Sequence, residues 1–194
     1  MNHRTIFYVI IFLFCYAFLQ AQPKVIFTPK VCFDLAGKHK YISPASSNTS
    51  DVDGGYSIGL EIGPRINDQL RSGLGFNYML PRLDRAKGSG EFRFMPIYFF
   101  GDVAISERSD LIVPSIIANV GYNVAFKGDL KYQRSFNLRG ALYLGFGMRV
   151  AIRGLLLESI YKAYWGSASV SGASSDLDTD IRYSLLSVGL GFNL

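Results

Sequence analysis

Few residues of this chain have the types and spacing that covalent chemistry needs. One candidate is a serine, histidine and acid site that combines His39, Ser43 and a loop aspartate, in which the histidine would activate the hydroxyl as a nucleophile. No paired sequence motif supports this site, so we interpret His39 as a solvated histidine at the rim of the fold. A zinc site needs more ligands than His39 and Cys32 supply. We therefore expect no catalytic residue, no metal and no cofactor, and hence no enzyme.

An acidic segment suggests a second kind of chemistry, the binding of a divalent cation. Asp176, Asp178 and Asp180 have the spacing at which a calcium loop begins. An EF-hand would then need glycine and glutamate where this chain has Ile181 and Ser187. We interpret the segment as a solvated acidic loop, and a loose divalent site that bridges lipid phosphates is the alternative.

Most other charged residues lie in stretches where bulky apolar side chains alternate with small or charged ones. The clearest is NLRGALYLGFGMRVAI, residues 137–152, in which Arg139 and Arg149 share one face with small residues and large apolar residues dominate the other. A period of two is typical of a β-strand. About 16 residues are many for a soluble strand, but they suit a tilted strand that crosses a membrane and projects beyond it.

The same alternation recurs along the chain and predicts eight strands. Tight turns and long polar connections follow one another between them, as in bacterial outer-membrane barrels. The stretch around Ile97 to Phe100 is apolar on both faces, which predicts a bulge or a locally apolar interior. The fold class is therefore all-β, an eight-stranded antiparallel up-and-down transmembrane β-barrel. The predicted strands are 30–42, 56–65, 70–78, 91–104, 112–124, 137–152, 155–165 and 186–194, and the long connections are 43–53, 81–90, 127–135 and 167–179.

The charged residues of these strands fall on the face that would line the barrel. Eight strands leave an interior just wide enough for side chains, so buried charges there must pair or meet trapped water. We expect an internal salt-bridge network that plugs the barrel and serves stability, with a gated or leaky ion path as the alternative. Beside Asp34, the predicted interior charges are Glu61, Arg65, Arg71, Arg93, Arg139, Arg149, Glu158 and Lys162.

The N-terminus predicts export. A basic start, the apolar run Ile6 to Leu19 and a small residue at Ala21 form the layout of a secretory signal peptide, too short for a comfortable transmembrane helix. We predict residues 1–21 as the signal peptide and 22–194 as the barrel domain, with an N-terminal anchor helix as the alternative. The predicted location is the outer membrane, with both termini in the periplasm. The net charge of +5 is spread along the chain, which argues against binding of nucleic acid.

Three segments carry a family resemblance: PRINDQLRSGLGFNYML, then FRFMPIYF with VPSIIANVGYNVAF, and the closing RYSLLSVGLGFNL. Through them the chain resembles the small outer-membrane barrels of the Bacteroidetes-type "outer membrane protein beta-barrel domain" group, which includes the PorT-like proteins. The last segment is similar to the C-terminal insertion signal that the barrel assembly machinery recognises, with Leu190, Phe192 and Leu194 as its alternating apolar residues. Phe192, and not the last residue, supplies the aromatic group.

Two functions follow from this sequence. The first is a non-enzymatic outer-membrane protein with a structural or interaction role in the cell envelope, four long extracellular loops, and lipids, lipopolysaccharide or envelope and secretion complexes as partners. The alternative is a barrel that binds or transports a small apolar ligand or lipid, through an apolar interior around Ile97 and Phe99. A soluble lipocalin-type barrel is disfavoured, because its outer face would carry the arginines. Basic residues that could meet lipopolysaccharide phosphates are Arg82, Arg85, Lys87, Lys127, Lys131 and Arg134.

Overall fold

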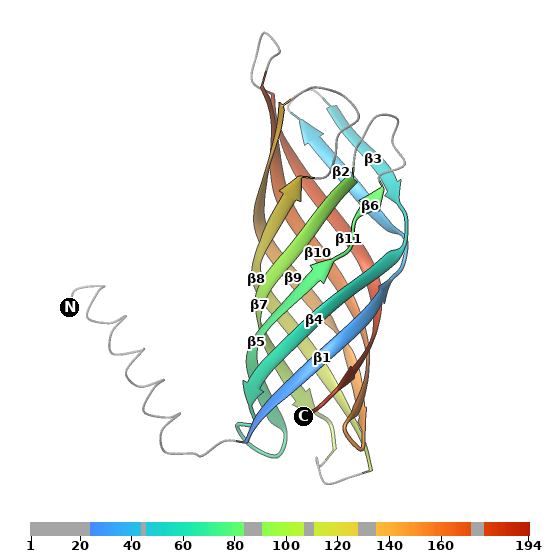
Figure 1. The fold of residues 1–194 in the computed structure, drawn as a ribbon, viewed down its shortest axis with the longest axis vertical. Coiled ribbons are helices and arrows are strands. Elements are labelled where there is room, and N and C mark those ends of the chain that lie inside the picture. The colour runs from blue at the N-terminus through green and yellow to red at the C-terminus, as the bar shows by residue number, and fades with distance from the viewer. Residues whose placement is uncertain (1–23, 44–45, 84–90, 107–110, 128–134, 172–176) are drawn as a thin grey trace, which may run out of the picture.

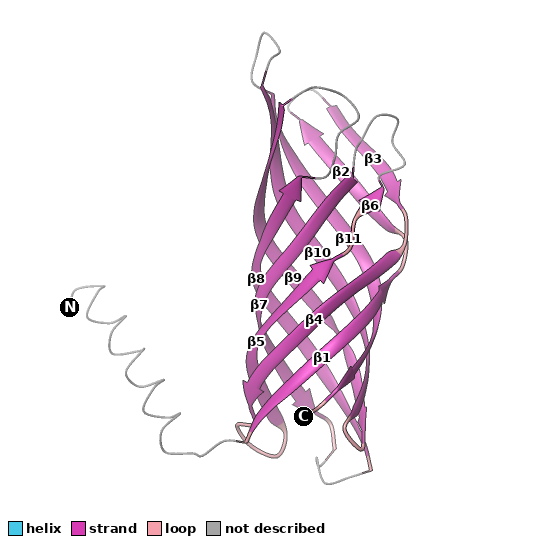
Figure 2. Ribbon diagram, viewed as in Figure 1, coloured by secondary structure: helices cyan, strands magenta, loops and turns pink. Residues whose placement is uncertain are grey.

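The computed structural model describes residues 24–43, 46–83, 91–106, 111–127, 135–171 and 177–194. The regular elements in these ranges are β-strands, which wrap into one tall barrel (Figures 1 and 2). The described ranges hold no helix long and apolar enough to cross a membrane. The strands are β1 (Val25–Asp34), β2 (Gly37–Ser43), β3 (Ser46–Val52), β4 (Gly55–Pro64), β5 (Leu70–Met79), β6 (Arg82–Leu83), β7 (Glu91–Ala104), β8 (Ile112–Lys127), β9 (Ser135–Ile152), β10 (Leu155–Ser171) and β11 (Leu177–Phe192).

The strands close into a ring. Antiparallel pairing runs in the order β1, β4, β5, β7, β8, β9, β10, β11, and β11 then pairs with β1. The three short strands extend members of this ring: β2 continues β1 along β11, β3 leads into β4, and β6 continues β5 along β7. The predicted eight-stranded antiparallel barrel is therefore confirmed. Closure suits a lipid environment, where no water can satisfy an open strand edge.

The two ends of the barrel differ. At one end lie the Arg153–Gly154 turn and the turn after β4, where the Asn67 side chain accepts hydrogen bonds from the amides of Gln69 and Leu70. Leu194 lies at the same end and exchanges backbone hydrogen bonds with Phe27. We call this the short-turn end, the lower one in Figure 1, and the opposite end, where β2 and β3 lie, the long-loop end.

Strands at the long-loop end are longer than the sequence predicted. β3 falls within the predicted connection 43–53, while β10 continues to Ser171 and β11 begins at Leu177. Their ladder runs without interruption from Leu155 opposite Phe192 to Val170 opposite Leu177. The prediction that these segments are loops throughout is wrong, because polar residues such as Ser and Thr continue a hydrogen-bonded ladder as well as apolar ones do once the strands are paired.

The outer face is apolar and the inner face is polar. Along β1, burial alternates strictly, so that Phe27, Val31 and Phe33 are exposed while Lys30 and Asp34 are buried. Large apolar side chains are likewise exposed on the outer faces of the other long strands, for example Val120 on β8 and Phe146 on β9. This arrangement is the reverse of that in a soluble protein, where apolar side chains are buried. The outer wall therefore fits the hydrocarbon of a bilayer.

Within the β9–β10 pair, the register shifts by one residue. Tyr143 is opposite Tyr164 but Gly140 is opposite Gly166, so β9 contains one extra residue there. A bulge of this kind exchanges the inward and outward positions beyond it. The sequence predicted a bulge, or a locally apolar interior, in the stretch that forms β7. The β7–β8 ladder is continuous from Phe92 to Ala104.

Candidate functional site

Five charged side chains meet inside the barrel and form what we call the central charge cluster: Lys30, Glu61, Asp102, Arg149 and Glu158. They come from β1, β4, β7, β9 and β10, so no two of them share a strand. The side chains of all five are at most 2% exposed. The cluster therefore ties together strands that are far apart in the sequence.

Each cation of the central charge cluster bonds to more than one carboxylate. The Lys30 Nζ lies 2.7 Å from Glu61 Oε1 and 2.9 Å from Glu158 Oε1. The Arg149 Nη2 lies 3.0 Å from Glu61 Oε2 and 2.6 Å from Glu158 Oε2, and its Nη1 lies 3.3 Å from Asp102 Oδ2. The Tyr98 hydroxyl donates a further hydrogen bond of 3.2 Å to Glu61. The carboxylates are thus held by shared charge-assisted hydrogen bonds, which are stronger than neutral ones.

A second group, the upper charge cluster, lies nearer the long-loop end and consists of Asp34, Arg82 and Lys162. The Arg82 Nη2 lies 2.5 Å from Asp34 Oδ2, and the Lys162 Nζ lies 3.3 Å from Asp34 Oδ1. Arg82 also donates to the carbonyl oxygens of Asp53 and Tyr56, each at 3.4 Å. Arg82 therefore reaches from β6 past the β4 backbone to β1.

Aromatic side chains fill the interior beyond the central charge cluster, toward the long-loop end. Phe94, Tyr143, Tyr164 and Tyr183 are buried, with ring centroids 5.2 Å apart between Tyr143 and Tyr164 and 5.6 Å apart between Tyr164 and Tyr183. Tyr98 adjoins this aromatic layer, 5.4 Å from Tyr143. The expected locally apolar interior near Ile97 to Phe100 is therefore present, supplied by Tyr98 and Phe100.

Glycines make room for the interior side chains at two positions. A Cβ atom at Gly189 would lie 2.8 Å from Glu158 Cγ and 2.9 Å from Cys32 Sγ, too close for either to stay in place. A Cβ atom at Gly55 would lie 2.9 Å from Arg82 Nη1. Glycine at these two positions therefore leaves the space that the Glu158 and Arg82 side chains occupy in the two charge clusters.

The structure places the predicted interior charges at three kinds of site. Glu61, Arg149, Glu158 and Lys162 lie in the two charge clusters. Arg71 is also inside and 1% exposed, but it donates to Thr28 Oγ1 at 2.8 Å and to Asn193 Oδ1 at 3.3 Å, and its guanidinium lies 5.0 Å from the centre of the Phe100 ring.

Arg65 is half-buried where the inner face meets the short-turn end, and it belongs to neither charge cluster.

Two predicted interior charges lie elsewhere. Arg139 is exposed, because the bulge between β9 and β10 reverses the alternation beyond Tyr143. Arg93 lies on the outer face of β7, next to the buried Phe94, and donates to the Tyr78 hydroxyl at 3.4 Å. The inward prediction for these two arginines is wrong.

Three members of the charge clusters were not predicted from the sequence to lie in the interior. Lys30 lay at the predicted start of a strand and Asp102 in a stretch with apolar residues on both faces, so neither stood out in the pattern. Arg82 was assigned to a long connection and to lipopolysaccharide contact, yet its side chain is buried. The other basic residues proposed for that contact lie outside the described residues or have side chains that are not described.

His39 also differs from its prediction. It is 3% exposed and its ring centroid lies 6.1 Å from that of Tyr183, so it is a buried residue inside the barrel and not a solvated one at the rim. The described residues contain no group of three histidine, cysteine or acidic side chains that could hold a metal ion. Of the acidic segment proposed for calcium, residue 176 lies outside the described residues.

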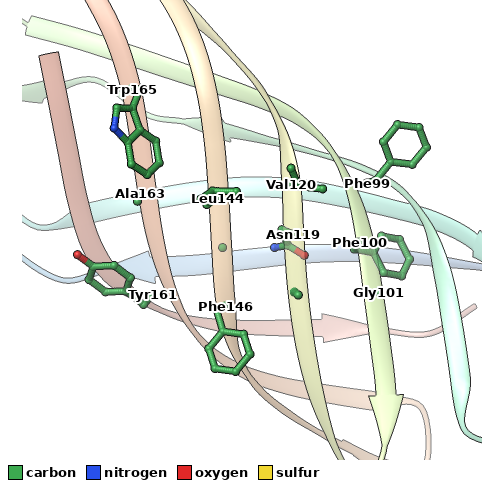
Figure 3. A pocket seen from close by; sticks show the side chains of 12 residues that line it. Phe99, Phe100, Gly101, Asn119, Val120, Leu144, Phe146, Tyr161, Ala163 and Trp165 are labelled. Carbon is green, nitrogen blue, oxygen red and sulfur yellow. The ribbon is translucent and has the colours of Figure 1, made fainter. Parts of the chain in front are cut away.

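An apolar hollow of about 710 Å³ lies on the outer wall, and not in the interior (Figure 3). It lies over β7, β8, β9 and β10, where the small residues Gly101, Ala118 and Ala163 are flanked by Phe99 and Phe146. Ile97 and Phe99 are 50% and 63% exposed, so the prediction that these two residues line an apolar interior is wrong. The side chains at 98 and 100 face inward in their place.

The solved structures with a similar fold include two outer-membrane proteins. The outer membrane protein OprG from Pseudomonas aeruginosa matches with a TM-score of 0.56 and 15% identity, over 88% of this chain and 94% of its own. The outer membrane protein AlkL, solved in DMPC lipid bilayers, matches with a TM-score of 0.55 and 14% identity, over 89% of this chain and 91% of its own. At this identity the likeness establishes the fold of an outer-membrane barrel. No protein-family model and no curated protein matches the chain, so membership of the PorT-like group stays a prediction.

Proposed function

We propose that this chain is a non-enzymatic integral protein of the outer membrane, whose barrel is closed by its own side chains. The observation that carries this proposal is the central charge cluster, in which Lys30 and Arg149 are each bonded to both Glu61 and Glu158. A cation held by two buried carboxylates is poorly placed to pass a solute, and the aromatic layer fills the next level of the interior. The arrangement therefore favours an interior plugged by salt bridges over a gated or leaky ion path through the barrel.

The role that suits a closed barrel is a structural or interaction role in the cell envelope. The barrel then acts as a rigid support for the segments at the long-loop end, which would meet lipopolysaccharide or subunits of an envelope or secretion complex. Leu190, Phe192 and Leu194 are exposed at the last strand, where the barrel assembly machinery could recognise them during insertion. Support for this comes from their outward position beside the β1–β11 closure.

The proposed orientation places the short-turn end in the periplasm, as in outer-membrane barrels generally, so that both chain termini lie there. A cysteine-labelling experiment tests location and orientation together. Ser47→Cys on β3 and Asp68→Cys in the turn after β4 introduce exposed thiols at opposite ends, while the natural Cys32 is buried. We expect a membrane-impermeant maleimide to label Ser47→Cys in intact cells and Asp68→Cys only after the outer membrane is permeabilised.

Two other labelling patterns would contradict the proposal. Labelling of Asp68→Cys but not of Ser47→Cys in intact cells would reverse the orientation. Recovery of the protein in the soluble periplasmic fraction would refute its insertion in the membrane. The unsubstituted chain is the matched control, because its one cysteine beyond the predicted signal peptide is Cys32.

A second function, the binding of a small apolar ligand or lipid, is favoured by one observation, the hollow on the outer wall. Its lining of Phe99, Val120, Leu144 and Phe146 would suit an acyl chain that lies along the barrel. Mass spectrometry of lipids that remain with the purified protein tests this function. A stoichiometric lipid that is lost from an Ala118→Trp variant would support it, and the absence of such a lipid would refute it.

A further inference from the structure

A small polar hollow lies at the short-turn end, apart from both charge clusters. Its volume is about 240 Å³, and its lining includes Lys24, Arg65, Arg153 and Asn193. The three cations reach it from separate parts of the chain: the residue before β1, the residue after β4 and the turn between β9 and β10. We call these four residues the basic mouth.

The cations of the basic mouth have no acidic partner in the part of the chain that the structure describes. No ion pair there includes Lys24, Arg65 or Arg153, and no aspartate or glutamate lines the hollow. The Arg65 Nε is buried without a hydrogen-bond acceptor. Even with a carboxylate at Leu194, the cations outnumber the anions. An anion in the hollow would compensate the excess positive charge.

The side-chain amide of Asn193, which lines the hollow, is held in a fixed orientation. The Asn193 Oδ1 accepts hydrogen bonds from Thr28 at 2.7 Å and from Arg71 at 3.3 Å. Because the carbonyl side of the amide is engaged by these two donors, its amide nitrogen is the group left to contact a ligand. The buried Arg71 guanidinium behind Asn193 adds a further positive charge at this level of the barrel.

Arg153 occupies a position that does not favour arginine. Its φ angle is 47°, and Gly154 follows with a φ angle of 89°. Both are positive, as in the two-residue turns that usually carry asparagine or glycine. A residue with a Cβ atom is disfavoured in this region of backbone conformation, so a role for the guanidinium would account for arginine here.

We propose that the basic mouth binds one phosphate group. Arginine provides a planar set of donors that matches phosphate oxygens, and lysine adds a point charge. The hollow could hold about eight water molecules, each with a volume of roughly 30 Å³, which is enough for a phosphate group but not for a whole lipid. The phosphate could be free in solution or part of a lipid headgroup, and the site does not depend on which way the barrel is inserted.

The test is a calorimetric titration of the full-length refolded protein in an uncharged maltoside detergent. One titrant is inorganic phosphate, and the other is dihexanoyl phosphatidic acid, a water-soluble lipid with a phosphate monoester headgroup. The test variant is Arg65→Gln with Arg153→Asn. Arg139→Gln is the matched control, because Arg139 is exposed on β9 far from the short-turn end. A shift in gel migration on boiling verifies that each variant is folded.

We expect the unsubstituted protein to bind at least one titrant, and each lost arginine to weaken binding about tenfold, equivalent to about 1.4 kcal/mol. Similar affinity for both titrants identifies the phosphate group alone as the ligand, whereas binding of the lipid only identifies a headgroup. Binding of neither titrant, or equal binding by the double variant, overturns the proposal. If the double variant does not fold, Arg153→Asn alone decides the matter, because asparagine suits the positive φ angle at that position.

Discussion

Replacing Arg149 by methionine removes the cation that three buried carboxylates share. The variant keeps the volume of the side chain approximately but removes the Arg149 bonds to Glu61, Asp102 and Glu158, and Lys30 is then the cation bonded to Glu61 and Glu158. Removal of one partner of a buried ion pair costs about 3–5 kcal/mol, because the remaining charge is uncompensated. We expect Arg149→Met to lower the free energy of unfolding by this amount.

A second substitution tests whether charge balance, and not packing, causes the loss. The central charge cluster contains two cations and three carboxylates, and Arg149→Met with Glu158→Gln restores the same excess of one carboxylate. The double variant should therefore be more stable than the sum of the two single losses predicts. Groups in one network couple by about 0.5–3 kcal/mol, and we expect a coupling in the upper half of that range.

The assay is urea unfolding in lipid vesicles, under conditions where unfolding and refolding curves coincide, with the fluorescence of Trp165 as the signal. Trp165 is the only tryptophan of the chain, so the signal comes from one place. Arg139→Met is the control, and because Arg139 is exposed its effect should stay within about 0.5 kcal/mol. A loss below about 1 kcal/mol for Arg149→Met, or strict additivity in the double variant, would refute the reasoning.

Three further predictions concern packing, sidedness and burial. Gly189→Ala should destabilise the barrel by about 1–3 kcal/mol in the same assay, because the added Cβ atom would displace Glu158. Gly101→Ala is the control and should not destabilise it, because a Cβ atom at Gly101 meets nothing within 4 Å. Equal effects of the two substitutions would contradict the role given to Gly189. Phe99→Arg should cost about 2–4 kcal/mol in vesicles, because we expect the exposed Phe99 to face lipid near the bilayer centre, and a neutral result would contradict that position. Cys32 should react with a maleimide only after unfolding, as followed by mass spectrometry, and rapid reaction of the folded protein would show that the interior is open.

The overall architecture could be predicted from the sequence because lipid imposes a simple pattern. Side chains that face hydrocarbon must be apolar, so the alternation in residues 137–152 indicates both a strand and its sidedness. Glu61, Arg149 and Glu158 could be assigned to the inner face from the same alternation. Strand limits were less predictable, since β3 and the ends of β10 and β11 are polar. Their sequences lack the apolar alternation that indicates a paired strand.

The errors have specific physical causes. A one-residue bulge reverses the faces of a strand, and the several glycines of β9 did not single out its position, so Arg139 was placed inside. In β7 both faces are apolar, so the alternation could not tell Arg93 and Ile97 from Tyr98. Arg82 lies in a polar stretch that resembles a loop, and His39 lies near the end of a predicted strand that was expected at the solvated rim. Only the closed barrel brings them to Asp34 and Tyr183.

The sequence did not predict which charged residues pair with one another. Lys30 and Glu158 are separated by 128 residues, and they meet because the strands are tilted and staggered when the ring closes. The pattern on each strand fixes which side chains point inward but not the level at which each lies. The basic mouth could not be predicted from the sequence either, because its three cations lie at turns or strand ends that are far apart along the chain.

The most direct test of the closed interior is an electrical measurement on the protein in a planar lipid bilayer. We expect that insertion, verified by the boiling-dependent shift in gel migration of the same preparation, produces no discrete current steps. Arg149→Met combined with Arg82→Met, which removes a cation from each charge cluster, serves as the comparison and should show steps if charge pairing closes the interior. Long-lived open channels in the unsubstituted protein would contradict the central claim that its side chains plug the barrel.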